Sequence, residues 1–200
     1  MIEKVRNIAK KHVLEAVNIR KYLHAHPELS FKEYETSKFI QSVLKKHGIP
    51  FTNGHVETGI IATIKGKNPN TKEILLRADL DALPITEDNN VEYKSKNEGV
   101  MHACGHDFHS ASLIGTALIL NELKEDFNGT IKFVFQPGEE KLPGGAKLMI
   151  EDGLLNNKPQ ACIAQHVYPD LQVGKVGFRP GLYMASADEI YITVKGKYLL

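Results

Sequence analysis

Short runs of branched aliphatic residues alternate along the chain with stretches of helical periodicity, and this alternation limits the chain to α/β architectures. The predicted strands lie at residues 59–66, 73–83, 129–140 (ending in a loop), 161–167, 172–181 and 188–196. The predicted helices run from near the N-terminus to about residue 24 and over 32–47, 110–125 and 144–155. Between them, residues 84–103 are polar and irregular and are expected to form a long loop.

Chain length and charge limit the kinds of protein that this sequence can encode. The 200 residues suffice for one domain, or for one domain and the start of a second. The formal net charge is +1 and basic residues are mixed with acidic ones, which argues against a nucleic-acid or membrane partner. No stretch approaches the ~20 apolar residues of a membrane span, and the N-terminus lacks the apolar core of a signal peptide. Two cysteines form no disulfide framework, so we predict a reducing, cytoplasmic location.

Polar side chains follow three of the predicted strands at the point where each strand ends. Asp79 and Asp81 close one strand, and their spacing of two places both on one face of an extended backbone. Glu139 and Glu140 follow the next clear strand, and His166 follows the one after it. Functional loops of α/β folds gather beyond the carboxyl ends of the strands. These segments are therefore predicted to meet at one edge of the sheet.

The segment MHACGHDFHS concentrates potential metal ligands. Cys104 and His106 are separated by one glycine, a spacing that suits a tight loop rather than a helix face. A thiolate and an imidazole both bind zinc-like ions. A small buried hydrophobe is the default interpretation of a lone cysteine, but the neighbouring histidines favour a metal site. His102 and His109 could lie near the metal or at the surface, and Asp107 could orient a ligand histidine.

Two adjacent glutamates, Glu139 and Glu140, leave the predicted strand IKFVFQPG. A solvated pair is the ordinary interpretation, but two carboxylates at a strand exit repel each other unless a cation compensates them. One carboxylate can bind a metal while the other faces a bound water, a division that suits metal-assisted hydrolysis. His166 becomes a candidate only because such a site needs further ligands. Neither G-x-S-x-G nor G-x-x-x-x-G-K-[ST] occurs, which argues against a serine hydrolase and a phosphate-binding loop.

Five motifs, in order along the chain, resemble one family. They are RKYLHAHPELSFKEYETSKFI, RADLDALPI, GVMHACGHDFHSASLIGTA, FVFQPGEEKLPGGAKLMIEDGLL and AQHVYPDLQVGKVGFRPG. Together they are similar to the amidohydrolases typified by hippurate hydrolase, auxin-conjugate hydrolase and N-acetyldiaminopimelate deacetylase, within the aminoacylase and carboxypeptidase metallopeptidase superfamily. The resemblance implies an α/β fold: over residues 1–184, the N-terminal part of a three-layer catalytic domain with a central mixed sheet flanked by helices. Over residues 185–200 it implies the first strand of a smaller α+β lid or dimerisation domain.

The resemblance also implies a chemistry, hydrolysis of the amide bond of N-acyl amino acids by a metal-activated water. Two divalent metal ions are implied, with zinc or manganese favoured and cobalt or nickel as alternatives. The positions that match metal ligands are Cys104, His106, Glu140 and His166. Glu139 matches the general base. The acidic motif that supports the site matches Asp79 and Asp81, which we count with Glu139 as candidate catalytic residues. The substrate would be a small molecule, and the full-length form could dimerise through its lid.

The last residues, VKGKYLL, depart from the family pattern, in which a glycine and a histidine follow the first lid strand. We therefore expect a truncated or frame-shifted product and keep two alternatives to an amidohydrolase. One is a catalytically inactive fragment that keeps part of the fold and weak metal binding. The other is a metallo-carboxypeptidase or aminopeptidase of the same superfamily. Cys104 argues against this second alternative, because an acidic ligand would be expected at its position.

Overall fold

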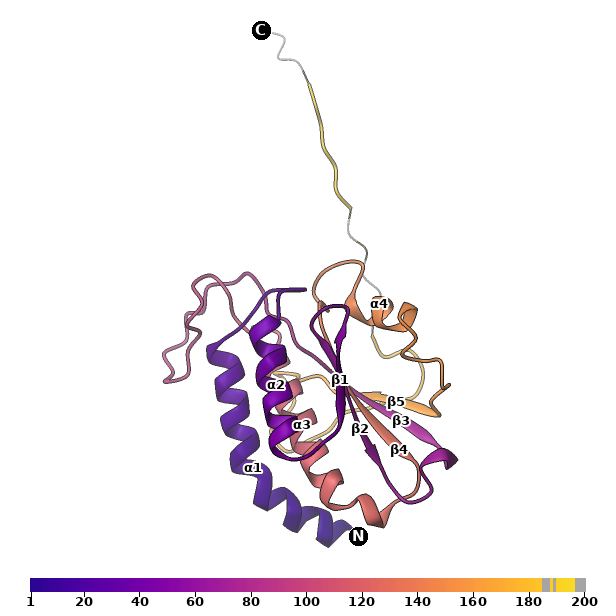
Figure 1. The fold of residues 1–200 in the computed structure, drawn as a ribbon. Coiled ribbons are helices and arrows are strands. Elements are labelled where there is room, and N and C mark those ends of the chain that lie inside the picture. The colour runs from indigo at the N-terminus through magenta and orange to yellow at the C-terminus, as the bar shows by residue number, and fades with distance from the viewer. Residues whose placement is uncertain (185–187, 189, 197–200) are drawn as a thin grey trace. The chain divides into compact units, whose positions relative to one another are not determined.

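The computed structural model describes residues 1–184, 188 and 190–196 (Figure 1). The chain forms two compact units, Met1–Val167 and Tyr168–Leu200. The helices of the first unit are α1 (Ile2–Ala25), α2 (Tyr34–Lys46), α3 (His106–Glu122) and α4 (Gly145–Glu151), with short 3-10 turns η1 (Pro69–Thr71) and η2 (Lys124–Asp126). Its strands are β1 (Phe51–His55), β2 (Gly59–Lys65), β3 (Glu73–Asp79), β4 (Thr130–Gln136) and β5 (Ala161–Ala164). In the second unit, the described residues form neither helix nor strand.

The strands form one mixed sheet in the order β1-β2-β4-β3-β5. β1 pairs with β2, and β2 with β4, in antiparallel fashion, whereas β3 lies parallel to both β4 and β5. The register pairs Asp79, the last residue of β3, with Gln136, the last residue of β4. Because β3, β4 and β5 run in the same direction, their carboxyl ends lie at the same edge of the sheet, as predicted.

Helices cover both faces of this sheet, so the unit has three layers. α1, α2 and α3 lie on one side and α4 on the other (Figure 1). The sequence of β4 shows why both faces need a cover, because neighbouring side chains of a strand point to opposite faces of the sheet. Phe133 and Phe135 belong to the core under α1, α2 and α3, whereas Val134 packs with Leu75 and Met149 on the α4 side. The predicted fold class, α/β with a central mixed sheet flanked by helices, is confirmed.

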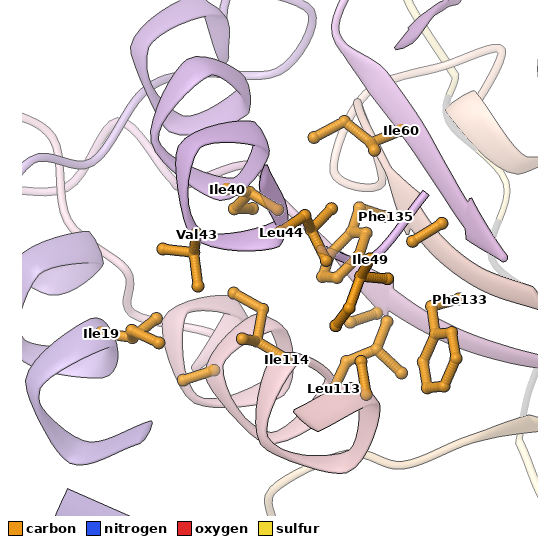
Figure 2. Packing of buried hydrophobic residues seen from close by; sticks show 14 of the residues in the cluster. Ile19, Ile40, Val43, Leu44, Ile49, Ile60, Leu113, Ile114, Phe133 and Phe135 are labelled. Carbon is orange, nitrogen blue, oxygen red and sulfur yellow. The ribbon is translucent and has the colours of Figure 1, made fainter. Parts of the chain in front are cut away.

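The larger core follows from the helical periodicity of the sequence. In α2, Ile40, Val43 and Leu44 form one apolar stripe, and all three are buried. Figure 2 shows this stripe beside Ile114 of α3, with Ile19 of α1 close by. This packing fixes α3 against the sheet and thereby determines where the first turn of α3 lies. In the part of the chain that is described, no helix combines the length and apolar character needed to cross a membrane.

The structure corrects several predicted boundaries. β1 was not predicted, since its sequence FTNGH contains polar residues and a glycine and its middle residues are exposed. The strand predicted over 73–83 ends at Asp79, and the helix predicted from residue 110 begins at His106. The strand predicted over 172–181 is irregular. The described residues of the expected lid strand, 188 and 190–196, are not in a strand either, and residues 197–200, which carry the departure from the family pattern, lie outside the described residues.

Candidate metal centre

Four segments of the chain meet at the carboxyl edge of the parallel strands. Asp79 ends β3, and the dipeptide Glu139–Glu140 follows β4. His166 follows β5, and His106 is the first residue of α3. The ligand atoms of three overlapping groups lie within 4.8 Å of one another inside each group: Cys104, His106 and His166; Asp79, His106 and His109; and His106, Glu139 and Glu140. His106 belongs to all three groups and is therefore the centre of the candidate site.

Gly105 allows the chain to place Cys104 and His106 on either side of one sharp turn. Its φ angle is +84°, in the left-handed region that residues with a Cβ rarely adopt. A Cβ at this position would lie 2.5 Å from Cγ2 of Val167. The glycine therefore permits both the start of α3 and the close approach of the segment that carries His166.

The ring of His106 is oriented by its neighbours so that one nitrogen faces the carboxylates. Nδ1 donates to the backbone carbonyl oxygen of Asp81 at 2.8 Å. Nε2 is buried and has no hydrogen-bond partner among the described residues. It lies 3.7 Å from Oε1 of Glu140 and 3.8 Å from Oε2 of Glu139. A ligand histidine typically donates its other ring N–H to a carbonyl in this way.

His166 is held in a similar manner. Its Nδ1 donates to the backbone carbonyl oxygen of Val167 at 2.7 Å. Its Nε2 then lies 3.4 Å from Sγ of Cys104. Two histidines and one cysteine thus present the atoms that zinc-like ions bind, and in both histidines the nitrogen facing the site is Nε2.

The electrostatics of the site favour a cation. Burial and then the charge of Glu140 raise the pKa of the Cys104 thiol to about 12. Burial opposes protonation of His106, but the Asp81 side chain, as a hydrogen-bond acceptor, and the charge of Asp79 together raise its pKa. In both residues nearby carboxylates contribute to the raised pKa, and a bound cation would compensate this negative charge. Nε2 of His106 and Oε1 of Glu140 are buried atoms without partners in the described part of the chain, which fits a metal site.

The two glutamates differ in their environment. The Glu140 side chain is 22% exposed and its Oε1 is buried, whereas the Glu139 side chain is 41% exposed. Burial and then the charge of Glu140 raise the pKa of Glu139. A carboxylate with a raised pKa that reaches solvent is suited to accept a proton, whereas the inner one is suited to bind a metal.

Asp79 and Asp81 both lie close to the ring of His106, and both also accept hydrogen bonds from other residues of the chain. Asp79 accepts hydrogen bonds from Arg77 and His109, each at 2.7 Å. Asp81 accepts from the Ser30 hydroxyl at 2.6 Å and from the Glu140 backbone N–H at 2.9 Å. Although burial opposes it, the His109 hydrogen bond and the Arg77 charge lower the pKa of Asp79 to about 2. These aspartates therefore hold the surrounding groups in place.

His109 is a residue whose role the sequence left open. Its Nε2 accepts the backbone N–H of Val167 at 3.0 Å, so its proton is on Nδ1, which donates to Asp79. It thereby links the acidic strand end to the segment that carries His166. His102, the other ambiguous histidine, is 4% exposed, and burial lowers its pKa to about 4. It is neither a surface residue nor a member of the three ligand groups found among the described residues.

Asp107 contacts α1 rather than a ligand histidine. Its Oδ2 accepts from Nδ1 of His24 and from Nε of Arg20, each at 2.8 Å. Nε2 of His24 lies 3.0 Å from Oε1 of Glu87. His24 contacts a carboxylate through each nitrogen, and its pKa is raised, chiefly by the hydrogen bond to Asp107, which favours the protonated ring. This buried network fastens the first turn of α3 to α1 and the 84–103 loop.

Comparison with known proteins places this geometry in a family. Residues 75–198 match the family described as peptidase family M20/M25/M40. The chain is 47% identical over 182 residues to the N-acetylcysteine deacetylase of Bacillus subtilis (strain 168), covering 90% of this chain and 47% of that protein. It is 40% identical over 195 residues to the N-acyl-L-amino acid amidohydrolase of Geobacillus stearothermophilus, covering 98% of this chain and 52% of that protein.

A solved structure agrees with the sequence relatives. The crystal structure of the Bacillus subtilis YXEP protein, a dinuclear metal-binding peptidase from the M20 family, matches with a TM-score of 0.78 and 46% identity. The match covers 82% of this chain and 46% of that one. The chain spans about half the length of the curated relatives it matches. Since the family match covers more than half of its residues, the chain belongs to peptidase family M20/M25/M40.

Proposed function

We propose that this chain carries the metal site of an amidohydrolase that cleaves the amide bond of N-acyl amino acids. The proposed metal ligands are Cys104, His106, Glu140 and His166. The proposed general base is Glu139, and the residues proposed to support the site are Asp79 and Asp81. The names of the two relatives, a deacetylase of N-acetylcysteine and an N-acyl-amino-acid amidohydrolase, support this substrate class.

One observation carries the proposal more than any other. Nε2 of His106 is buried without a hydrogen-bond partner among the described residues, yet it faces Glu139 and Glu140 at 3.8 and 3.7 Å. Leaving a buried polar nitrogen unpaired costs about 1–3 kcal/mol, so a group that binds it is expected. A divalent cation would bind this nitrogen and compensate the carboxylates at the same time.

The residues of the chain then have distinct tasks. When bound, divalent ions would make a water molecule more acidic and polarise the amide carbonyl. Glu139 accepts one proton from the water, whose oxygen attacks the carbonyl carbon. The carbon–nitrogen bond breaks, and Glu139 returns the proton to the leaving amine. The products are a carboxylate and a free amino acid.

Several finer points belong to the same proposal. The favoured ions are zinc and manganese, with cobalt and nickel as alternatives, because the mixed sulfur, nitrogen and oxygen donors suit all four. Residues 1–184 form part of a catalytic domain, and residues 185–200 begin a lid domain through which the full-length form dimerises. The protein acts in the cytoplasm on a small molecule, with no nucleic-acid or membrane partner. The net charge of +1 and the cysteine content support this view.

The test compares the chain with its Glu139→Gln variant. Metal content is measured by elemental analysis, and hydrolysis is measured with N-acetyl, N-benzoyl and N-succinyl amino acids. We expect the variant to keep its metal and to lose about 10²–10⁴-fold in turnover, because the amide cannot accept the proton. Unchanged turnover in the variant would place the base elsewhere.

The same assay separates the alternatives. A chain that binds metal and hydrolyses none of these substrates would support the inactive-fragment interpretation. Cleavage of unblocked dipeptides in preference to N-acyl amino acids would support a peptidase, an activity consistent with the family description.

A further inference from the structure

Glu33 is a carboxylate buried in an unusual position. Its side chain is 0% exposed, and in the described part of the chain it forms no ion pair. Burying a carboxylate without a cationic partner is costly, so such a residue is expected only where its hydrogen bonds serve a purpose. Burial raises the pKa of Glu33, against the effect of its hydrogen-bond donors.

The hydrogen bonds of Glu33 lead directly to the proposed base. Oε1 accepts the backbone N–H of Gly138 at 2.8 Å and that of Phe31 at 2.9 Å. Oε2 accepts the hydroxyl of Thr58 at 2.8 Å. Gly138 immediately precedes Glu139, so Glu33 holds the Pro137–Gly138 peptide unit, one residue before the base.

A second contact joins the same two segments. Gly138 has a φ angle of +55°, and a Cβ there would lie 2.4 Å from Cε1 of Phe31. Phe31 itself has a φ angle of +61°, which is strained for a residue with a Cβ. The hydrogen bond from the Phe31 N–H to Glu33 holds this conformation, which places the aromatic ring against Gly138.

The other side of Glu139 is held through Asp81. Oδ2 of Asp81 accepts the backbone N–H of Glu140 at 2.9 Å and the hydroxyl of Ser30 at 2.6 Å. Residues on both sides of Glu139 are thus anchored by the segment 30–33, Glu33 acting on Gly138 directly and Ser30 on Glu140 through Asp81. We name residues 137–140 the base loop.

We propose that Glu33 is a positioning residue that holds the base loop in the geometry required for metal binding and proton transfer. This inference rests on the proposed function of Glu139 and Glu140. Positioning groups behind metal ligands typically contribute 10–100-fold to metal affinity or activity. The alternative is that Glu33 contributes only to stability, and substitutions at Glu33 and Thr58 separate the two.

The experiment uses the 200-residue chain and three variants. Glu33→Leu removes both acceptor oxygens, and Glu33→Gln keeps one that can still accept from Gly138. Thr58→Val is the matched control, because Thr58 is 1% exposed and donates only to the Glu33 oxygen that does not bind Gly138. Thermal unfolding is recorded for every protein, so that loss of stability is known separately.

The first readout is the dissociation constant for zinc alone. We expect Glu33→Leu to weaken zinc binding by about 10–100-fold. Glu33→Gln should recover most of the lost zinc affinity. Thr58→Val should change the zinc affinity less than about threefold, because removing the Thr58 hydroxyl leaves the bond between Glu33 and Gly138 intact. Equal weakening in Glu33→Leu and Thr58→Val, in proportion to lost stability, would overturn the proposal, as would unchanged affinity in Glu33→Leu.

The second readout needs neither metal nor activity. Hydrogen–deuterium exchange of the peptide that contains the base loop should become faster in Glu33→Leu, while peptides from β2 and β3 keep their rates. Unchanged exchange in the base loop would overturn the proposal even if zinc binding falls. If the wild-type chain takes up no zinc, the proposed function is wrong. The exchange measurement would still decide whether Glu33 holds the base loop.

Discussion

His106 donates through Nδ1 to the backbone carbonyl oxygen of Asp81, and this single bond of 2.8 Å turns its Nε2 toward Glu139 and Glu140. A backbone acceptor fixes the ring more firmly than a side chain would, since the carbonyl moves only with the chain. The affinity of the proposed site therefore depends on this bond, which turns the ligand nitrogen toward the carboxylates.

The first prediction is that His106→Ala loses bound metal. The change removes the one residue shared by all three ligand groups among the described residues. We expect the zinc content of the purified protein to fall by at least half. His12→Ala is the matched control, because His12 is also buried but contacts Glu122 far from the site. Equal zinc content in His106→Ala and the wild type would contradict the prediction.

The second prediction concerns the two cysteines. In metal-free protein the Cys104 thiol has a pKa raised to about 12 and is only partly exposed, whereas Cys162 is exposed on β5. Because the thiolate is the reactive form, iodoacetamide at pH 8 should modify Cys162 first. Mass spectrometry of the digested protein measures both sites. Faster modification of Cys104, with Cys104→Ser as the assignment control, would show that the thiol is not held protonated.

The third prediction assigns a positioning role to His109. Since Nε2 of His109 accepts the Val167 N–H, His109→Leu should release the segment that carries His166. We expect zinc binding to weaken about 10–100-fold without loss of a ligand. Ser110→Ala is the control, because Ser110 is equally buried and donates to the backbone oxygen of Asp79. Comparable weakening in both variants would point to a general loss of packing instead.

The sequence predicted which polar residues lie close together better than it predicted the edges of the fold. Parallel strands bring their carboxyl ends to one edge, so Asp79, Glu140 and His166 could be expected to meet from the order of the elements alone. Spacing along the chain could not predict the contacts of His109 and Glu33. Each accepts a backbone N–H from a distant segment, and such contacts leave no pattern in the sequence.

The strand errors have a similar cause. β1 is a strand because its backbone pairs with β2, although the sequence FTNGH has a low strand propensity. The segment 172–181 shows the reverse, since its valine and phenylalanine residues are typical of a strand, yet it is irregular in the structure. A strand exists only where a neighbouring strand supplies its hydrogen bonds, and the local sequence does not show which segment will be that neighbour.

The fourth prediction is a pH dependence where the middle of α1 meets the C-terminal end of α2. Hydrogen bonds from Lys46 and then His47 lower the pKa of Glu15 from 4.5 to about 2. A lowered pKa stabilises the fold above the unfolded value, and this contribution disappears as the pH falls from about 4.5 toward 2. Glu15→Gln should thus cost about 1 kcal/mol at pH 7, because partly exposed ion pairs are screened, and almost nothing near pH 2.

Urea unfolding at pH 7, 5 and 3 measures the effect at Glu15. Glu98→Gln serves as the control, since Glu98 is exposed and forms no ion pair in the described part of the chain. A difference between wild type and Glu15→Gln that stays constant down to pH 3, or grows, would contradict the expected direction of this pH dependence.

The fifth prediction tests the core that positions α3. Ile114 is 0% exposed and packs with residues of α1 and α2, so Ile114→Ala leaves a cavity that the surrounding helices cannot fill (Figure 2). We expect a loss of about 2–5 kcal/mol in the free energy of unfolding. Ile150→Ala is the control, because it makes the same chemical change on α4, where Ile150 is 47% exposed. It should change the free energy of unfolding by less than about 1 kcal/mol, since little buried surface is lost and alanine favours a helix. Urea denaturation should show a lower midpoint for Ile114→Ala with an unchanged slope, since the slope reflects the surface exposed on unfolding. Because α3 begins at His106, the same variant should also weaken zinc binding, whereas equal midpoints for the two variants would mean that α3 is not held by this core.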